Sequence, residues 1–227
     1  MKQKIMNVDK IVYSKRKTLA IIVDNKANVI VRAPLRTPKK SIERFVNEKK
    51  GWISAKKQEI LAKLEEIPHR RFIENEHILF LGNEYEVSFI DGMLYPVIFD
   101  DRKFLISANY KDHAREILEM WYKKKAKMLF YDKAIDYSQA MNVEFNKVKI
   151  SNAEKRWGSC STKKNINLSW KLIMAPEKVI DYVIIHELAH LIELNHSRRF
   201  WNIVENIDPD YHYSICWLKE NGHLLTI

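Results

Sequence analysis

Three histidines and one glutamate near residue 190 have the types and the spacing of a hydrolytic metal site. Residues 186–196 read HELAHLIELNH. His186 and His190 are four residues apart, so in a helix both imidazoles project from one face, about one turn apart. This arrangement suits two ligands of one Zn²⁺, each at roughly 2.0–2.1 Å. Glu187 points about 100° away around the helix, where its carboxylate can serve as a general base.

A catalytic zinc keeps one coordination position open, so a third protein ligand is expected. His196 is the favoured third ligand, because the chain can turn back to the metal once the helix has ended. Asn195 is predicted to support that turn as a left-handed cap. Glu205, on the helix expected to follow, is the alternative third ligand, and glutamate-liganded zinc peptidases place a carboxylate on such a helix.

The chemistry expected of this set is hydrolysis. Zinc lowers the pKa of a bound water molecule toward about 7, and Glu187 takes the proton as the water attacks a carbonyl. Imidazole ligands also suit Mn²⁺ and Ni²⁺, so these ions stay open as alternatives to zinc.

The elements that must position the motif are mostly helical. Pro176 opens the motif helix, and the apolar run YVII at residues 182–185 is expected to bury it. A second long helix is predicted from about 111 to 141, since its apolar residues recur at helical spacing. The segments 147–151 and 166–170 are predicted to form a small sheet.

The first half of the chain reads as strands around one long helix. Residues 18–23 and 29–31 are predicted strands of a hairpin, and a helix is predicted from Pro38 to about Leu64. Turn residues separate four further predicted strands, which are 78–81, 85–90, 97–99 and 104–106.

Composition bounds the class of protein. The chain has 227 residues, 46% of them hydrophobic and 30% charged, which is ordinary for a globular protein. Two cysteines, no apolar run long enough for a signal peptide and no stretch of 18 apolar residues favour a cytoplasmic protein that does not span a membrane.

The net charge of +10 leaves two interpretations open. Basic residues occur along the whole chain and are densest at 123–127, so a solvated basic surface is favoured. A nucleic-acid partner is the alternative, because a field of this sign attracts polyanions.

Two sequence blocks carry a resemblance to a known family. The stretches RWGSCS (156–161) and INLSWKLIMAPEKVIDYVIIHELAHLIELNHSRRFW (166–201) resemble the YgjP-like metal-dependent hydrolases, also called YgjP-like metallopeptidases. That family is similar to the zincin peptidases and to DNA-repair proteases of the Spartan and Wss type. The resemblance is strong over about the last 80 residues, and the N-terminal hairpin and helix share it.

The resemblance implies a zincin-like catalytic domain with three histidine ligands and a glutamate base, which map onto His186, His190, His196 and Glu187. In metzincin peptidases, which share the ten-residue spacing from the first ligand to the third, a glycine supplies the turn. Glu193 holds that position here.

Substrate contacts are assigned less directly. In zincins a strand above the active helix pairs with extended substrate, and the segment 156–169 is the candidate for it. Arg156 could bind a carboxylate or a phosphate, or Arg156 and Trp157 could fix this hairpin onto the core. Tyr211 could stabilise an oxyanion, with packing as the alternative.

The sequence therefore predicts an α+β fold in two parts. Residues 1–106 form a β-rich N-terminal region with one long helix at about 38–64, and residues 107–227 form a zincin-like metallohydrolase domain, helical with a small sheet. The favoured function is a zinc metallopeptidase with a peptide or protein substrate. A metal-dependent nucleotide pyrophosphohydrolase and a non-catalytic, zinc-bearing nucleic-acid-binding module are the alternatives.

Overall fold

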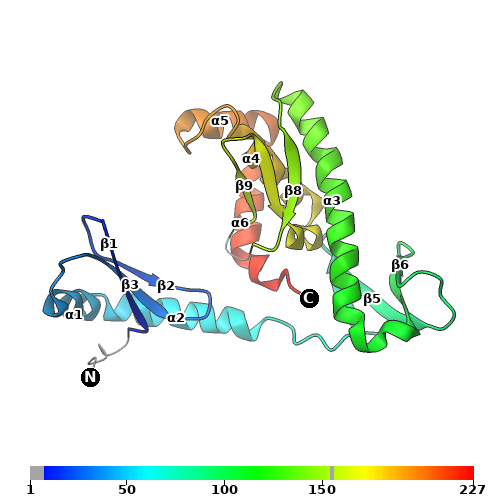
Figure 1. Cartoon of the computed structure of the whole chain (residues 1–227), viewed down its shortest axis with the longest axis horizontal. Coiled ribbons are helices and arrows are strands. Elements are labelled where there is room, and N and C mark those ends of the chain that lie inside the picture. Colours follow the sequence, from blue (N-terminus) through cyan, green and yellow to red (C-terminus); the bar gives the residue numbers. More distant parts are fainter. Residues whose placement is uncertain (1–7, 154–155) are drawn as a thin grey trace. The chain divides into compact units, whose positions relative to one another are not determined.

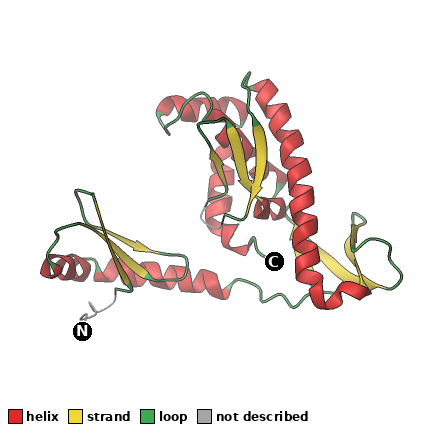
Figure 2. Ribbon diagram, viewed as in Figure 1, coloured by secondary structure: helices red, strands yellow, loops and turns green. Residues whose placement is uncertain are grey.

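The computed structural model describes residues 8–153 and 156–227, and the chain forms two compact units (Figure 1). The first unit ends at Pro68 and the second begins at His69. Both units combine helices with small sheets, which confirms the α+β class (Figure 2). No helix of the described residues is long and apolar enough to cross a membrane.

The first unit is a three-stranded sheet with two helices against one face. Its elements are β1 (Lys10–Ser14), β2 (Ala20–Val23), β3 (Val29–Pro34), α1 (Lys39–Glu48) and α2 (Lys50–Glu65). β3 is central and pairs in parallel with β1 and antiparallel with β2. Alternate residues Val29, Val31 and Ala33 of β3 are buried with Ile42 of α1 and Ile53 of α2, so this unit has a core of its own.

The single helix predicted over about 38–64 is wrong, because the chain forms two helices that meet at Lys49. Lys49 has φ −102° and ψ 9°, outside helical geometry. Gly51 lowers helix propensity next to the break, and the break lets both helices direct buried side chains at the same sheet face. β1 was not predicted. It pairs with β3, about 20 residues further along the chain, and local sequence patterns do not reveal a pairing over that distance.

The second unit holds the two remaining sheets and the long helices. Its elements are β4 (His77–Phe80), β5 (Asn83–Ile90), β6 (Val97–Phe99), β7 (Lys103–Ser107), α3 (Ala114–Ala140), β8 (Lys147–Ser151), β9 (Gly158–Cys160), β10 (Asn165–Ser169), α4 (Glu177–Ala189), α5 (Arg198–Ile207) and α6 (Tyr211–Asn221). Short 3₁₀ turns span Ala108–His113, Trp170–Met174 and Gly222–Leu224. The sheets have the orders β4-β5-β7-β6 and β8-β10-β9.

The sequence placed a domain boundary between residues 106 and 107, whereas the compact units divide at Pro68. The reason is aromatic packing between α3 and the four-stranded sheet. The ring of Trp121 on α3 lies 5.2 Å from that of Phe80 and 5.0 Å from that of Phe104. These buried contacts join the sheet to α3, so β4–β7 share one core with the helices that follow.

The three-stranded sheet of the second unit lies beside α4, the helix that carries the histidine motif (Figure 1). β10 is central and contributes buried Ile166 and Leu168 to the core. β9 is an edge strand of this sheet and contacts α4. The sheet therefore sets one wall beside the motif.

Candidate metal centre

The histidine motif lies at the end of a buried helix. α4 has apolar side chains on most of its surface, and Ile184, Ile185 and Leu188 are almost fully buried. The helix ends at Ala189, and His190 is its C-cap. A helix packed on several sides is rigid, so His186 and its neighbours are held in fixed positions.

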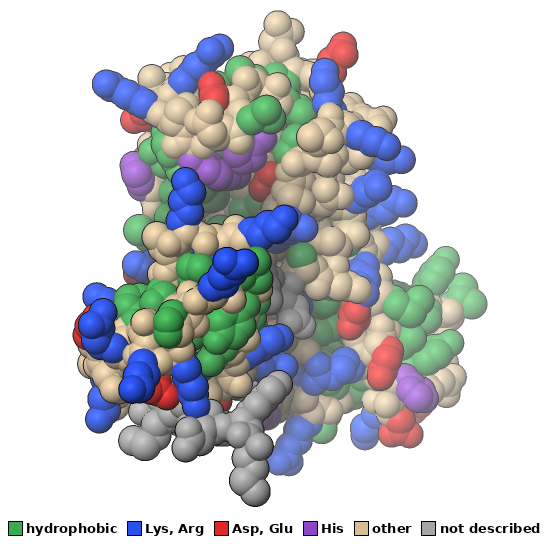
Figure 3. Space-filling model, turned by 60° about the vertical axis from the view of Figure 1, so that its left-hand side comes forward, with side chains coloured by type: hydrophobic (Ala, Val, Ile, Leu, Met, Phe, Trp, Pro, Cys, Tyr) green, Lys and Arg blue, Asp and Glu red, His purple; other side chains and the backbone are tan. Residues whose placement is uncertain are grey.

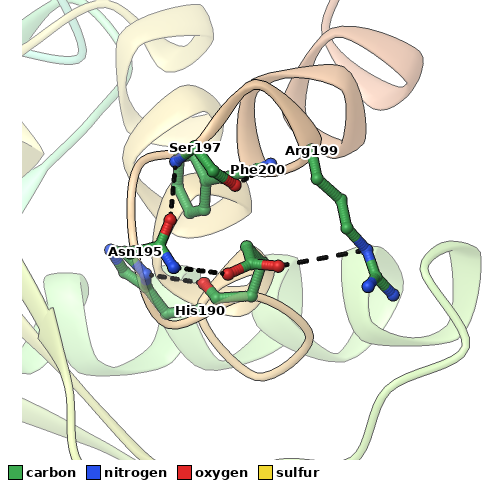
Figure 4. Close-up of polar contacts among 6 residues, drawn as sticks. His190, Asn195, Ser197, Arg199 and Phe200 are labelled. Carbon is green, nitrogen blue, oxygen red and sulfur yellow. Dashed lines mark hydrogen bonds and ion pairs between the residues drawn. The ribbon is translucent and has the colours of Figure 1, made fainter.

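A tight loop brings His196 back toward α4. Figure 4 shows the polar contacts that hold this loop, among them those of Asn195 and Ser197. The backbone N–H of Ser197 donates to Asn195 Oδ1 at 2.9 Å, and Asn195 Nδ2 donates to Glu193 Oε1 at 2.8 Å. Ser197 then caps α5, since its hydroxyl accepts from the N–H of Phe200. The predicted left-handed Asn195 is wrong: Asn195 is not among the described residues with positive φ and acts through its side chain.

The three histidines converge. Nε2 of His186 lies 3.1 Å from Nε2 of His196, and one ring nitrogen from each of His186, His190 and His196 lies within 4.8 Å of the others. Two nitrogen ligands of a tetrahedral zinc ion, each at about 2.0–2.1 Å, would be about 3.3 Å apart. The spacing and the donor types therefore fit a zinc site.

The second ring nitrogen of two of these histidines has a partner of its own. The hydroxyl of Tyr182 lies 3.3 Å from Nδ1 of His186, and the backbone carbonyl of Glu193 lies 3.2 Å from Nδ1 of His190. With the proton on Nδ1, each of these contacts is a hydrogen bond that leaves the Nε2 lone pair directed at the shared centre.

Burial keeps two of these imidazoles neutral, which is the form that binds a metal. Burial, together with the neighbouring His190 and His196, lowers the pKa of His186 to about 3. Burial is also the main reason why the pKa of His190 is lowered.

One aromatic side chain supports all three rings. Phe200 is fully buried, and its ring centroid lies 4.9 Å from that of His186, 4.6 Å from that of His190 and 4.8 Å from that of His196. Phe200 thus forms an apolar floor that fixes the spacing of the imidazoles. His196 is exposed, so the centre stays open to solvent on that side, and Figure 3 shows histidine side chains gathered at a hollow in the surface.

Glu187 is buried against β9. It is 6% exposed, and a Cβ on Gly158 would lie 2.5 Å from its Oε1. Only a residue without a side chain allows this approach. Burial raises the pKa of Glu187 to about 7, while the backbone N–H of Cys160 and the charge of Arg156 oppose the rise.

Two of the predicted substrate residues have structural contacts. Trp157 packs against Gly222, where an added Cβ would lie 2.8 Å from the indole ring. Tyr211 is 7% exposed and stacks on Trp201 at 5.3 Å and on Tyr182 at 6.4 Å. Both therefore hold the framework around the site together.

Arg156 is the predicted substrate residue that stays exposed, and its charge acts on Glu187. Glu205, the alternative ligand, is exposed on α5 and is not part of the three-histidine cluster. Tyr182 and Gly158 were not predicted as residues of the site. Tyr182 could have been found, because it lies four residues before His186 on the same face of the helix.

Comparison with known proteins agrees with this geometry. A family model described as YgjP-like, metallopeptidase domain, matches residues 17–221. The chain belongs to the YgjP-like family. The model of this family describes a metallopeptidase domain, and the described residues offer the three-histidine cluster as a site for a metal ion.

The individual relative found for this YgjP-like protein matches a shorter part of the chain than the family model does. The UTP pyrophosphatase of Escherichia coli (strain K12) is 30% identical over 78 residues, which are 34% of this chain and 47% of the relative. The chain thus spans about half the length of the curated relative it matches.

Two solved structures are similar in part. The zymogen of Pyrococcus abyssi abylysin, a metallopeptidase, is 23% identical with a TM-score of 0.37. The match covers 40% of this chain and 93% of the abylysin chain. The zymogen of Methanocaldococcus jannaschii jannalysin, also a metallopeptidase, is 23% identical with a TM-score of 0.35. The match covers 38% of this chain and 93% of the jannalysin chain.

Proposed function

We propose that this YgjP-like protein is a zinc-dependent peptidase, with His186, His190 and His196 as the metal ligands and Glu187 as the general base. The observation that carries the proposal is the convergence of three imidazoles beside a buried carboxylate. A purely structural zinc site needs ligands and has no use for a base, so Glu187 favours catalysis.

A bound zinc ion would supply Lewis acidity, which polarises a carbonyl group and makes water more acidic. Glu187 accepts a proton from the attacking water on a carboxylate oxygen and returns it to the leaving nitrogen. Burial suits the carboxyl group to both steps, since a pKa raised to about 7 lets it hold and release a proton near neutral pH. The N–H of Cys160 keeps the carboxylate in place.

The position of β9 supports a peptide substrate. Among the described residues β9 pairs with β10 and presents its other edge away from the sheet. Gly158 of β9 is also the residue that contacts Glu187. An extended peptide could pair with this free edge and so bring its backbone carbonyl next to the base.

A nucleoside triphosphate is the second candidate substrate, and one relative named UTP pyrophosphatase favours it. Arg156, close enough to Glu187 to lower its pKa, could hold a phosphate group. The described residues contain no further group of three or more metal-binding side chains, whereas phosphoryl hydrolases commonly use two metals.

The test combines metal content with turnover of both substrates. Purified wild type, His196→Ala, Glu187→Gln and Glu205→Ala are measured for zinc by elemental analysis, then for cleavage of fluorescent casein and for pyrophosphate release from UTP. Wild type and Glu205→Ala should carry zinc and cleave casein. His196→Ala should lose zinc, while Glu187→Gln should keep zinc and lose turnover.

Each alternative gives a different result. Pyrophosphate release that depends on Glu187, without casein cleavage, replaces the peptidase with the nucleotide hydrolase. Zinc loss in Glu205→Ala but not in His196→Ala overturns the ligand set. Full turnover by Glu187→Gln removes the base from the proposal.

A further inference from the structure

The net positive charge of the protein belongs to its first unit. Residues 1–68 hold 17 of the 39 Lys and Arg but only 7 of the 29 Asp and Glu, so their formal charge is +10. The 22 basic and 22 acidic residues of 69–227 cancel. Basic residues occur along the whole chain, but most of the acidic residues that balance them lie in residues 69–227. Figure 3, turned to bring this unit forward, shows Lys and Arg side chains spread over its surface around a patch of hydrophobic ones.

The strand topology gathers basic residues at one end of the sheet. β1 runs parallel to β3 with Ser14 opposite Pro34, and β2 starts at Ala20 opposite Arg32. The connection after β1 and the segment after β3 therefore leave the sheet at the same end. Five basic residues lie there, and we call them the basic end: Lys15, Arg16, Lys17, Arg32 and Arg36.

The acidic side chains of the strand region lie at the other end. Asp24 sits in the turn between β2 and β3, where its carboxylate accepts the backbone N–H groups of Lys26 and Asn28. Asp9 precedes β1 and accepts the N–H of Val29. Between residues 10 and 42 Asp24 is the sole acidic residue, so no carboxylate in that stretch offsets the basic end.

Three acidic residues of the helices are engaged in ion pairs within their own helix. The ion pairs within α1 and α2 are Lys39–Glu43, Arg44–Glu48 and Lys56–Glu59. These pairs join neighbouring turns of one helix, so they neutralise helix charges and leave the field of the basic end in place.

The side chains at the basic end suit phosphate groups better than a lipid surface. Three of the five are arginines, whose planar guanidinium groups bind phosphate in a bidentate way. Tyr13, 45% exposed at the same end, offers a ring for stacking. Membrane binding by an amphipathic helix needs a continuous apolar stripe, yet the exposed Trp52 and Leu61 of α2 project from opposite sides of that helix, about 180° apart.

We propose that the basic end of the first unit binds nucleic acid through its phosphate backbone, independently of base sequence. The first unit would then hold the hydrolase on a nucleic acid, while the metal centre lies in the other unit. The proposal does not depend on the substrate of the metal centre, since none of its residues belongs to that site.

Binding is measured with the full chain and a short fluorescein-labelled DNA duplex of mixed sequence, by fluorescence anisotropy. The test variant carries Lys15→Gln, Arg16→Gln, Lys17→Gln and Arg36→Gln together. The matched control carries Lys123→Gln, Lys124→Gln, Lys125→Gln and Lys127→Gln on α3, which is the densest lysine cluster of the sequence. Both variants lose four positive charges, so a difference in their affinity for the duplex cannot come from net charge alone. Unchanged thermal melting and metal content show that each is folded.

The test variant should bind the duplex at least about 100-fold more weakly at low salt, and its slope of log K against log salt should become shallower by about 3–4. The control should bind within a few-fold of wild type. Equal losses in the two variants, or a larger loss in the control, overturn the assignment to the basic end. Wild type that binds phosphatidylserine vesicles but not the duplex overturns nucleic acid as the partner.

Discussion

Gly158 is the position where one added methyl group should separate catalysis from metal binding. In Gly158→Ala the new Cβ would lie 2.5 Å from Oε1, 2.6 Å from Cγ and 2.8 Å from Cδ of Glu187. Gly158 lies in a strand and has no positive φ, so alanine fits the backbone and the clash falls on the carboxylate.

The size of the effect follows from these distances. Glu187 must move by about 0.9 Å to restore 3.4 Å, the shortest ordinary contact. Misplacing a catalytic group by about 1 Å costs roughly 10²-fold in rate, which corresponds to about 2.7 kcal/mol of barrier. The three atoms nearest to the added Cβ all belong to Glu187, so zinc content should stay at the wild-type level.

The assay is turnover of whichever substrate the wild type cleaves, measured beside zinc content and thermal melting. Gly51→Ala is the matched control, because no atom lies within 4 Å of its added Cβ and alanine suits an exposed helix. Gly158→Ala with wild-type turnover would refute the role of Glu187 as the base held by β9. Loss of zinc in Gly158→Ala would show that β9 supports the ligands instead.

Three further substitutions test the framework of the site. Phe200→Ala should lower the free energy of unfolding in urea by about 3–5 kcal/mol, because it opens a cavity beneath the imidazoles. Phe200→Leu should lower it by less. Equal losses in the two variants would argue against close packing around Phe200. Tyr182→Phe should weaken zinc binding by about 10–100-fold in a chelator competition, since it removes the hydroxyl next to Nδ1 of His186; unchanged affinity would mean that this contact does not orient the ring. Gly82→Ala should lower the melting temperature, because Gly82 has φ +82° and its Cβ would lie 2.8 Å from Pro176; an unchanged melting curve would show that the chain relaxes there freely.

Local patterns in the sequence determined much of this protein. The four-residue spacing of His186 and His190 and the apolar run before them predicted a buried helix, and α4 is that helix. Alternating β-branched residues and turn pairs located most of the strands. These features are visible in the sequence because each depends on residues within a few positions of one another.

Contacts between distant segments were decided by the tertiary structure alone. Gly158 meets Glu187 and Phe200 meets three imidazoles because separate elements pack together, and no spacing rule encodes either contact. The division at Pro68 likewise follows from aromatic packing between α3 and β4–β7. The charge of +10 could be counted from the sequence, but the gathering of five basic residues at one end of a sheet depends on β1 pairing in parallel with β3. The sequence thus supplied the reactive groups, and long-range packing set the positions in which they can act together.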